Sequence, residues 1–201
     1  MSLGRAAVVV CVGGGVLGGS PRAVCRLVAD VASALGGEVG ATRAVVDAGW
    51  IGSSLLVGAS GVTIDPVVYL GFGVSGTAFH EIGRPAHVVS VNTDPAAPLM
   101  ARATLPLRTD AIALLHELAP RLRAAYRPRA GRPWAEELRA GCGHRRAGED
   151  VNGVDLRRMD GRVYERMRMV TGGPIRPVRP IVPLLAVEAA AALIDYLEEC
   201  C

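Results

Sequence analysis

The first 120 residues alternate short apolar, β-branched runs with stretches in which apolar residues repeat at helical spacing. This alternation is typical of a parallel sheet covered by helices, because parallel strands need a long crossover connection between them. The first run, residues 6–12, passes directly into glycines and predicts a buried strand. We therefore expect an α/β fold built on a mostly parallel sheet.

The clearest local prediction is a helix after the first glycines. Ser20 is placed to cap this helix and Pro21 suits its first turn, while glycines at 36 and 37 would end it. Apolar residues repeat on one face of the predicted helix, namely Val24, Leu27, Val28, Val31 and Leu35. We expect that face to pack on the sheet.

Five further strands are predicted downstream of this helix, at residues 38–44, 55–57, 67–71, 87–91 and 103–107. Helices are expected after the fourth and sixth strands of the chain, beginning at Gly76 and at Asp110. The second of these helices has a buried stripe at Ile112, Leu115, Leu118 and Leu122.

Small and polar residues follow the predicted strands where each strand ends. They are Thr42 and Arg43, Gly58, Ser60 and Gly61, Gly73 and Ser75, Asn92 and Asp94, and Asp110. In an open parallel sheet the carboxyl ends meet at one edge, where ligands bind. The same residue types also form ordinary loops and helix caps. Spacing alone therefore leaves a shared ligand site and plain loops as alternatives.

The first glycine cluster, residues 13–19, lies between a strand and a helix, where backbone N–H groups can hold a phosphate. It contains the pattern GxGxxG at Gly13, Gly15 and Gly18, but five glycines in seven positions satisfy many patterns by chance. All 22 basic residues are Arg, since the sequence contains no Lys. An ATPase with a Walker phosphate-binding loop is therefore excluded.

Charge divides the chain near residue 120. Residues 1–120 hold 7 Arg and 8 acidic residues, whereas residues 121–201 hold 15 Arg and 11 acidic residues. An Arg-rich segment can bind an anionic partner, but no nucleic-acid motif accompanies it. We interpret it as a solvated surface or linker, expect no nucleic-acid partner, and divide the chain into a domain at 1–122 and an Arg- and Pro-rich extension at 123–201.

The extension ends in two regular patterns. Prolines recur every third residue at Pro174, Pro177, Pro180 and Pro183, which favours a stiff polyproline II segment. A helix is predicted next, at residues 184–199, with a wide apolar surface and a narrow acidic face. That apolar surface must be buried, either on this domain or on a partner.

The five cysteines show no CxxC spacing, and Cys142 with His144 is the only close pair of a Cys and a His; Cys200 and Cys201 are adjacent at the end of the sequence. We therefore expect free thiols, with neither a disulfide framework nor a metal site. The apolar run at the start is too short for a signal peptide, and no stretch reaches the roughly 20 apolar residues of a membrane span. We expect a cytoplasmic protein without a membrane span.

Five features in order resemble the FAD-binding domain of the electron transfer flavoprotein alpha subunit. They are GATRAVVDAGW (40–50), LLVGASG (55–61), GFGVSGTAFH (71–80), VNTDPAAPLM (91–100) and Asp110. The resemblance covers residues 5–120 and implies a doubly wound, DHS-like NAD/FAD-binding domain that holds FAD. It also implies an electron carrier between flavin dehydrogenases and an acceptor, as in fatty acid β-oxidation, rather than an enzyme with catalytic residues of its own.

The resemblance assigns eleven residues to FAD binding, namely Thr42, Arg43, Gly58, Ser60, Gly61, Ser75, Gly76, Thr77, His80, Asn92 and Asp110. Arg43 would lie against the flavin and favour its reduced, anionic forms, because a fixed guanidinium stabilises negative charge on the ring. Thr42 would assist by hydrogen bonding, and the Ser60 hydroxyl would reach the flavin. His80 would reach the pyrimidine edge of the ring or the ribityl chain.

The remaining assignments concern the ribityl, phosphate and adenosine parts of the cofactor. Ser75 and the N–H groups of Gly76 and Thr77 would begin a helix and hold ribityl or pyrophosphate oxygens. Asn92 and Asp110 would bind the adenosine half, and Asp110 would also cap the following helix.

The sequence also departs from the family pattern. Gly15 or Val16 stands where the family has an Arg, and Leu56, Ala59 and Phe79 stand where it has glutamines. A degenerate binding module without redox activity is therefore a second hypothesis. Family alpha subunits place another domain ahead of this one and pair with a beta subunit, so we expect a separate beta-like partner.

Overall fold

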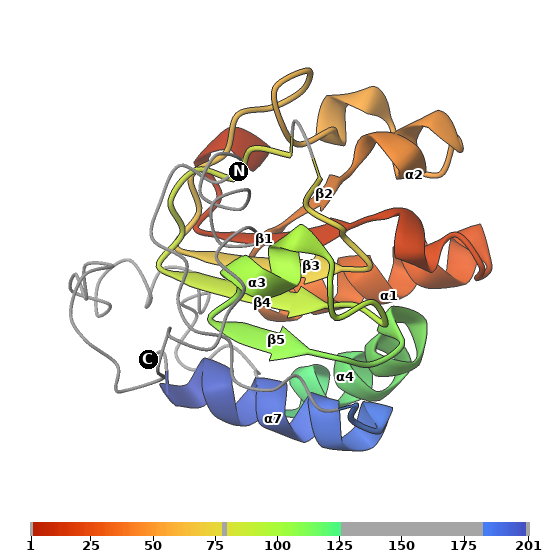
Figure 1. Ribbon diagram of the computed structural model, residues 1–201, viewed down its shortest axis with the longest axis vertical. Helices are drawn as coiled ribbons and strands as arrows, with labels where there is room; N and C mark the ends of the chain where they lie inside the picture. The colour runs from red at the N-terminus through yellow and green to blue at the C-terminus, as the bar shows by residue number, and fades with distance from the viewer. Residues whose placement is uncertain (1, 78–79, 126–182, 200–201) are drawn as a thin grey trace.

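A computed structural model describes residues 2–77, 80–125 and 183–199 (Figure 1). Its centre is a sheet of five parallel strands in the order β2-β1-β3-β4-β5. The strands are β1 (Val8–Val12), β2 (Glu38–Ala41), β3 (Val68–Phe72), β4 (His87–Val91) and β5 (Leu105–Leu107). The predicted α/β fold with a mostly parallel sheet is confirmed.

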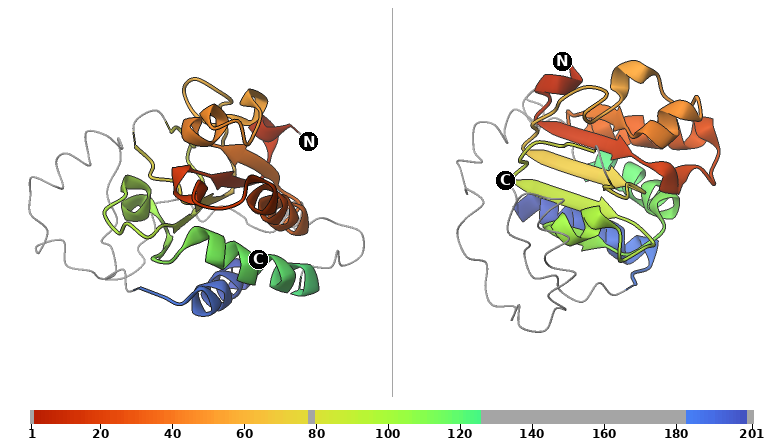
Figure 2. Two further views of the ribbon diagram at one scale, coloured as in Figure 1. Left: turned by 90° about the vertical axis from the view of Figure 1, so that its right-hand side faces the viewer. Right: turned by 45° about the horizontal axis from the view of Figure 1, so that its top comes forward.

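Helices and irregular segments cover both faces of the sheet (Figure 2). The helices are α1 (Pro21–Ala34), α2 (Arg43–Asp47), α3 (Pro98–Arg102), α4 (Ala111–Ala125) and α7 (Ala186–Glu199), with 3-10 turns η1 (Leu3–Arg5), η2 (Gly14–Val16) and η3 (Ser53–Leu55). One face carries a core formed with α1, α4 and α7. The opposite face is covered by the segments that precede β3 and β4 and by α3. The sheet is therefore wound on both sides, and the winding reverses between β1 and β3.

Burial explains the composition of the central strands. Every residue of β1 and of β3 is buried, so both strands are continuous apolar runs and do not alternate with polar residues. In α1, Val24, Val28 and Val31 are fully or almost fully buried, as the helical spacing predicts. Ser20 occupies the N-cap position, although its side chain makes no capping hydrogen bond. Gly36 follows this helix with φ of 61°, a left-handed value that favours glycine.

Two predicted elements are wrong. In the strand predicted at 55–57, Leu55 ends the 3-10 turn η3, and Leu56 and Val57 form only isolated bridges, with Ala41 and Val62, because the chain turns at Gly58, where φ is 118°. No helix begins at Gly76, where φ is 72°, and the described residues of 74–86 contain no regular element. A left-handed backbone at this position is incompatible with a right-handed helix. The strand predicted at 38–44 is also shorter, since α2 begins at Arg43.

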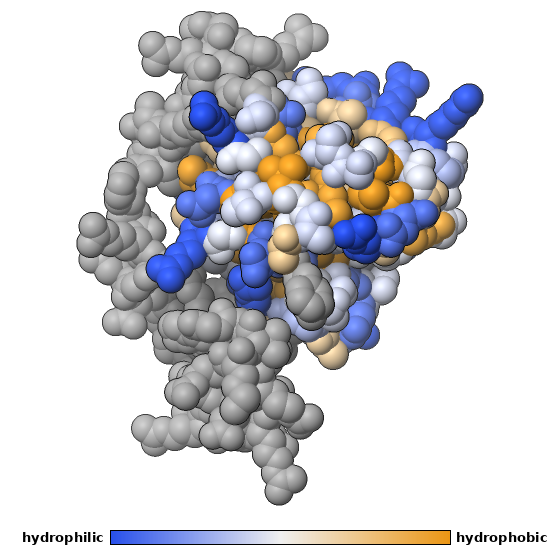
Figure 3. Space-filling view, turned by 90° about the horizontal axis from the view of Figure 1, so that it is seen from above, coloured by the Kyte–Doolittle hydropathy of each residue, from blue (hydrophilic) through white to orange (hydrophobic). Residues whose placement is uncertain are grey.

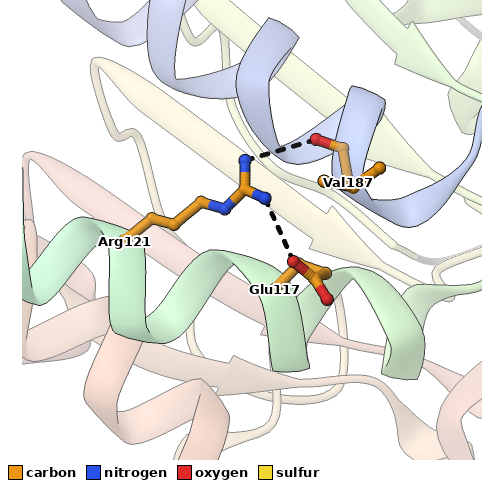
Figure 4. Close-up of polar contacts among 3 residues, drawn as sticks. All are labelled: Glu117, Arg121 and Val187. Carbon is orange, nitrogen blue, oxygen red and sulfur yellow. Dashed lines mark hydrogen bonds and ion pairs between the residues drawn. The ribbon is translucent and has the colours of Figure 1, made fainter.

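The terminal helix α7 (Ala186–Glu199) buries one apolar face on this domain, whereas Val187 near its start stays exposed. Ala189, Ala190, Leu193 and Leu197 are fully buried in the same core as α1 and α4. The Arg121 guanidinium of α4 donates to the Val187 carbonyl of α7 over 3.4 Å and to Glu117 Oε2 over 3.1 Å (Figure 4). The apolar surface that the sequence assigned either to this domain or to a partner is therefore covered here by α4.

A second contact holds α7 against the edge of the sheet. Tyr196 Oη lies 2.8 Å from His87 Nδ1 of β4 and donates to Thr104 Oγ1 over 2.9 Å. Ahead of the helix, Pro183 forms a parallel bridge with Arg108, directly after β5. The two hydrogen bonds of Tyr196 connect residues that are 92 and 109 positions apart in the sequence.

Several sequence predictions lie outside the described residues. They are the polyproline II spacing at Pro174, Pro177 and Pro180, the Arg-rich stretch at 126–182, and the Cys142–His144 and Cys200–Cys201 pairs. In the part of the chain that the structure describes, no helix is long and apolar enough to cross a membrane. The same residues contain no cluster of three or more His, Cys, Asp or Glu side chains arranged to hold a metal ion.

Candidate cofactor-binding site

The strands of the sheet end level with one another. Val12 pairs with Ala41 and with Phe72, Phe72 pairs with Val91, and Val91 pairs with Leu107. The first residues of the following loops continue the ladder: the N–H groups of Thr42, Gly13, Gly73 and Asn92 donate to the carbonyls of Val12, Phe72, Val91 and Leu107 over 2.8–3.2 Å. The loops that carry most of the predicted site residues therefore leave the sheet together at its carboxyl edge.

Glycine backbones pack directly against one another where the winding reverses. A Cβ atom on Gly13 would lie 2.4 Å from the Gly73 carbonyl oxygen, and one on Gly15 would lie 2.8 Å from Gly73 Cα. Gly18 is exposed, and a Cβ atom there would meet nothing within 4 Å. The edge between β1 and β3 consequently presents bare backbone, to which a ligand can approach closely.

Neither Gly15 nor Val16, the two candidate positions of the family Arg, presents a side chain at this edge. Gly15 has no room for a side chain because Gly73 lies against it, and Val16 is fully buried in the core. The turn therefore supplies no side-chain cation to a ligand at this edge.

Arg43 and Ser60 come together at the end of β2. Arg43 is the first residue of α2, and its Nη2 donates to Ser60 Oγ over 2.8 Å. Arg43 Nη1 lies 3.8 Å from Asp47 Oδ1, one turn along the same helix. The Arg43 side chain remains 58% exposed, so these contacts orient the guanidinium but leave it accessible. Figure 3 shows the face of the molecule on which α2 lies, with apolar side chains near its middle and hydrophilic side chains around them.

The loop that presents Ser60 is a tight turn that needs both of its predicted glycines. The Gly61 N–H donates to the Gly58 carbonyl over 2.9 Å, and Gly58 has φ of 118°. A Cβ atom on Gly61 would lie 2.2 Å from the Leu56 carbonyl oxygen. Leu56 itself is buried under the turn, whereas Ala59 is exposed. Gly58 and Gly61 therefore shape the loop, and Ser60 supplies its hydroxyl.

Ser75 and Thr77 form a polar turn after β3 instead of a helix N-terminus. Ser75 Oγ lies 3.2 Å from Thr77 Oγ1, and the Ser75 carbonyl accepts the Leu99 N–H over 2.9 Å. A Cβ atom on Gly76 would lie 2.7 Å from Leu99 Cβ. The turn is therefore docked on α3, with two exposed hydroxyl groups, and the expected helix dipole is absent from it.

His80 contacts a buried tyrosine of β3. Its Nε2 lies 2.5 Å from Tyr69 Oη, and the two rings meet edge to face with centroids 5.8 Å apart. Burial lowers the pKa of His80 to about 4; the positive charge of Arg102 lowers it further, whereas a hydrogen bond with the Val57 backbone opposes the shift. His80 is therefore neutral at pH 7.

Sequence reasoning missed Tyr69. A tyrosine inside a central apolar strand has no local signal that separates it from the core, and only the fold brings it to a residue eleven positions away. Burial raises the pKa of Tyr69 well above its ordinary value, and the neighbouring Cys11 raises it further. Burial also raises the pKa of Cys11 to about 12, so this thiol is not ionised.

Asn92 and Asp110 are engaged in local hydrogen bonds. Asn92 Nδ2 donates to the Val74 carbonyl over 3.2 Å and its Oδ1 accepts the Asp94 N–H, which ties the loop after β4 to the loop after β3. Asp110 Oδ1 accepts the Ala113 N–H over 2.7 Å and caps α4, as predicted. Both residues lie at the carboxyl edge, where a ligand can reach their remaining acceptors.

Comparison with known proteins agrees with this geometry. Residues 2–84 match the family model described as the electron transfer flavoprotein FAD-binding domain. This part of the chain is homologous to that domain. The resemblance predicted from the sequence is thereby confirmed, and the matched flavoprotein segment contains all of the predicted site residues except Asn92 and Asp110.

Curated relatives carry related names. Protein FixB of Bradyrhizobium diazoefficiens is 41% identical over 122 residues, which are 60% of this chain and 32% of the relative. The probable electron transfer flavoprotein subunit alpha, mitochondrial, of Caenorhabditis elegans is 37% identical over 125 residues, or 61% and 36% of the two chains. The electron transfer flavoprotein subunit alpha of Clostridium acetobutylicum is 34% identical over 125 residues, again 61% and 36%. The chain thus spans about a third of the length of these relatives.

The residues present fit a dinucleotide such as FAD. The glycine loops offer backbone without side chains, Arg43 is an accessible cation held by two neighbours, and Ser60, Ser75 and Thr77 add exposed hydroxyl groups. Backbone N–H groups, hydroxyls and a guanidinium are the groups that hold phosphate and sugar oxygens and stabilise a charged ring.

Proposed function

We propose that this chain binds FAD at the carboxyl edge of its sheet and works as an electron transfer flavoprotein alpha-like subunit. The hydrogen bond between Arg43 and Ser60 carries this proposal, because it joins two residues of separate family motifs at the end of β2. The match of residues 2–84 to the flavoprotein FAD-binding domain supports FAD as the cofactor.

In this proposal the protein positions the cofactor and sets its charge environment. Bound FAD supplies one-electron and two-electron transfer. Arg43, oriented by Ser60 and Asp47, stabilises negative charge on the ring, and Thr42 stands beside it as the N-cap of α2. The predicted role of His80 is a polar contact with the ring or the ribityl chain, made by a neutral imidazole.

The remaining polar groups would hold the rest of the cofactor. The exposed hydroxyls of Ser75 and Thr77 and the glycine turn before α1 would contact ribityl and phosphate oxygens. Asn92, which begins the loop after β4, and Asp110, which ends the loop after β5, would contact the adenosine half. The three glycines of the predicted set, Gly58, Gly61 and Gly76, act through the shape of their loops.

The partners of the carrier follow from the same proposal. A beta-like subunit would complete the assembly, and a flavin dehydrogenase, such as one of fatty acid β-oxidation, would donate the electrons in the cytoplasm. The proposed cofactor domain is residues 1–122, and the extension at 123–201 returns to it through α7.

The experiment is to purify the full chain alone and together with a beta-like subunit encoded near it, and to add FAD to both preparations. We expect yellow protein with about one FAD per chain, and FMN as the matched control should bind more weakly because it lacks the adenosine half. Protein that stays colourless in both preparations after incubation with FAD would contradict the proposal.

A second candidate function is a nucleotide-binding module without redox activity. Two departures favour it: Gly15 or Val16 stands where the family has an Arg, and the buried Leu56 stands where it has a glutamine. Calorimetric titration with ADP decides between the two: a colourless chain that binds ADP supports the module, whereas tight FAD binding with reversible reduction of the flavin supports the carrier.

A further inference from the structure

Tyr69 lies in the middle of the sheet, but its ring extends toward the carboxyl edge. The residue is fully buried on the face opposite α1. A Cβ atom on Gly71 would lie 3.1 Å from Tyr69 Cε1, so the ring lies beside a residue that has no side chain. Gly71 pairs with Cys11 of β1, one register position before the strands end. The glycine therefore provides the space that brings the Tyr69 hydroxyl close to the candidate site.

The surroundings of this hydroxyl leave it few polar partners. Val9, Val57 and Leu99 belong to the same buried cluster as Tyr69 and are apolar. A buried phenol needs a hydrogen-bond partner, because a buried hydroxyl without one loses the hydrogen bonds it makes to water in the unfolded chain. The 2.5 Å contact with His80 Nε2 satisfies it, and Cys11 is the other polar neighbour. The imidazole is consequently held at one nitrogen by a group that is itself rigidly packed.

We propose that Tyr69 is a positioning residue for His80. The Tyr69 hydroxyl holds the imidazole of His80 in a single orientation at the carboxyl edge, so that the imidazole is already oriented when the cofactor binds. This inference rests on the proposed function. Tyr69 does not itself touch the cofactor, because its side chain is enclosed in the layer beneath the loops. A side chain fixed before binding loses less conformational entropy when the ligand arrives, which increases affinity.

The charged and titratable neighbours act in the same direction. Burial disfavours the protonated, positively charged form of His80 and so lowers its pKa. The positive charge of Arg102, at the end of α3, lowers the pKa further. The thiol of Cys11 and the phenol of Tyr69 both stay protonated, because burial raises the pKa of each. The pair therefore keeps one protonation state through the neutral range, which leaves orientation as the property that Tyr69 controls.

The test is Tyr69→Phe, which keeps the ring and removes the hydroxyl. The chain offers a matched control, Tyr196→Phe, which removes the hydroxyl of a second tyrosine–histidine pair whose ring centroids are 5.7 Å apart, on α7. The first measurement is an NMR titration of the histidines in the full chain without FAD, with the His80 signal assigned through its loss in His80→Gln.

We expect Tyr69→Phe to raise the His80 titration midpoint by at least about half a pH unit, because a released ring can turn toward water. Tyr196→Phe should leave the His80 midpoint unchanged. An unchanged His80 midpoint in folded Tyr69→Phe protein would overturn the inference. If Tyr69→Phe does not fold, the NMR chemical shifts of the His80 imidazole nitrogens in the wild-type chain decide. A single tautomer of His80 supports the inference, and a mixture of both tautomers overturns it.

The second measurement is FAD affinity. Tyr69→Phe and His80→Gln should each weaken FAD binding about fivefold, and the double variant should bind no more weakly than His80→Gln alone. Fully additive losses would contradict a role of Tyr69 through His80. A wild-type chain that binds no FAD would disprove the proposed function, yet the NMR titration would still decide whether Tyr69 orients His80.

Discussion

The backbone of Gly73 lies against that of Gly15, so closely that a Cβ atom on Gly73 would stand 2.9 Å from Gly15 Cα. The two glycines belong to the loops after β3 and β1, at the point where the winding of the sheet reverses. Their contact keeps both loops level with the strand ends. The carboxyl edge thus depends on two residues without side chains.

Gly73→Ala should therefore lower the free energy of unfolding more than an ordinary glycine substitution does. Gly73 has φ of 65°, and Gly49, with φ of 74° and no atom within 4 Å of an added Cβ, is the matched control. We expect a loss of about 1 kcal/mol for Gly49→Ala from backbone strain, and about 3 kcal/mol for Gly73→Ala, where overpacking adds to the strain. Urea denaturation measures the free energy of unfolding of both variants. Equal losses would show that the loops after β1 and β3 move apart to accommodate the added methyl group at little cost.

Arg43→Ala should reduce the affinity for FAD about tenfold to a hundredfold, because in the proposed function the guanidinium would make a charge-assisted contact with the ring. Arg26→Ala, an exposed cation on α1, serves as the control for the loss of one positive charge. Fluorescence titration with FAD measures both affinities. If both substitutions weaken FAD binding by the same small factor, the proposed role of Arg43 is wrong.

Lowering the pH should destabilise the protein through His80. The pKa of His80 is lowered from 6.5 to about 4 in the folded chain, mainly by burial, so below pH 6.5 the unfolded chain takes up a proton that the folded chain does not. The stability present above pH 6.5 is consequently lost as the pH falls toward 4, by roughly 3 kcal/mol at most. The unfolding free energies of wild type and His80→Gln should be measured from pH 7 to pH 4. Over this range the wild-type value should fall by up to this amount more than the His80→Gln value.

The control for this pH dependence is His116→Gln, since His116 is exposed on α4. Its unfolding free energy should fall with pH in parallel with wild type. A His80→Gln curve that also stays parallel to wild type would show that His80 is not the group responsible.

Leu193→Ala should test the docking of α7. Leu193 is fully buried against the core that α4 shares, whereas Leu185 is 67% exposed at the start of the same segment. We expect Leu193→Ala to lower the free energy of unfolding by about 2–5 kcal/mol and Leu185→Ala by less than about 0.5 kcal/mol. Thermal denaturation followed by circular dichroism should give one transition for both; a separate early transition would mean that α7 is not part of the cooperative unit.

Much of the fold was predictable because its signals are local. The helix at Pro21–Ala34 has a proline start and an apolar face within its fourteen residues, and Gly36 follows two positions after its end. The strand at Val8–Val12 is a continuous apolar run. The similarity to an FAD-binding domain, which the match of residues 2–84 supports, was predictable for the same reason, since the motifs that carry it are short. The proposed roles of the eleven site residues in FAD binding stay predictions.

The predictions that failed depended on backbone angles and distant packing. The helix expected from Gly76 does not form because the chain there bends over Leu99 of α3 with a positive φ. The strand expected at 55–57 is reduced to bridges by the turn at Gly58. Periodicity cannot reveal either turn, since a glycine is compatible with many backbone conformations.

Residue order alone was sufficient for the parallel α/β class and the resemblance to an FAD-binding domain, because the periodicity and the short motifs that indicate them involve residues a few positions apart. The register that makes the strands end level was found only in the structure. The contacts of Arg43 with Ser60, Tyr69 with His80 and Leu193 with the α4 core join residues that are distant in the sequence. Such contacts depend on the path of the whole chain and on which side chains it buries together, so the three-dimensional structure was needed to find them.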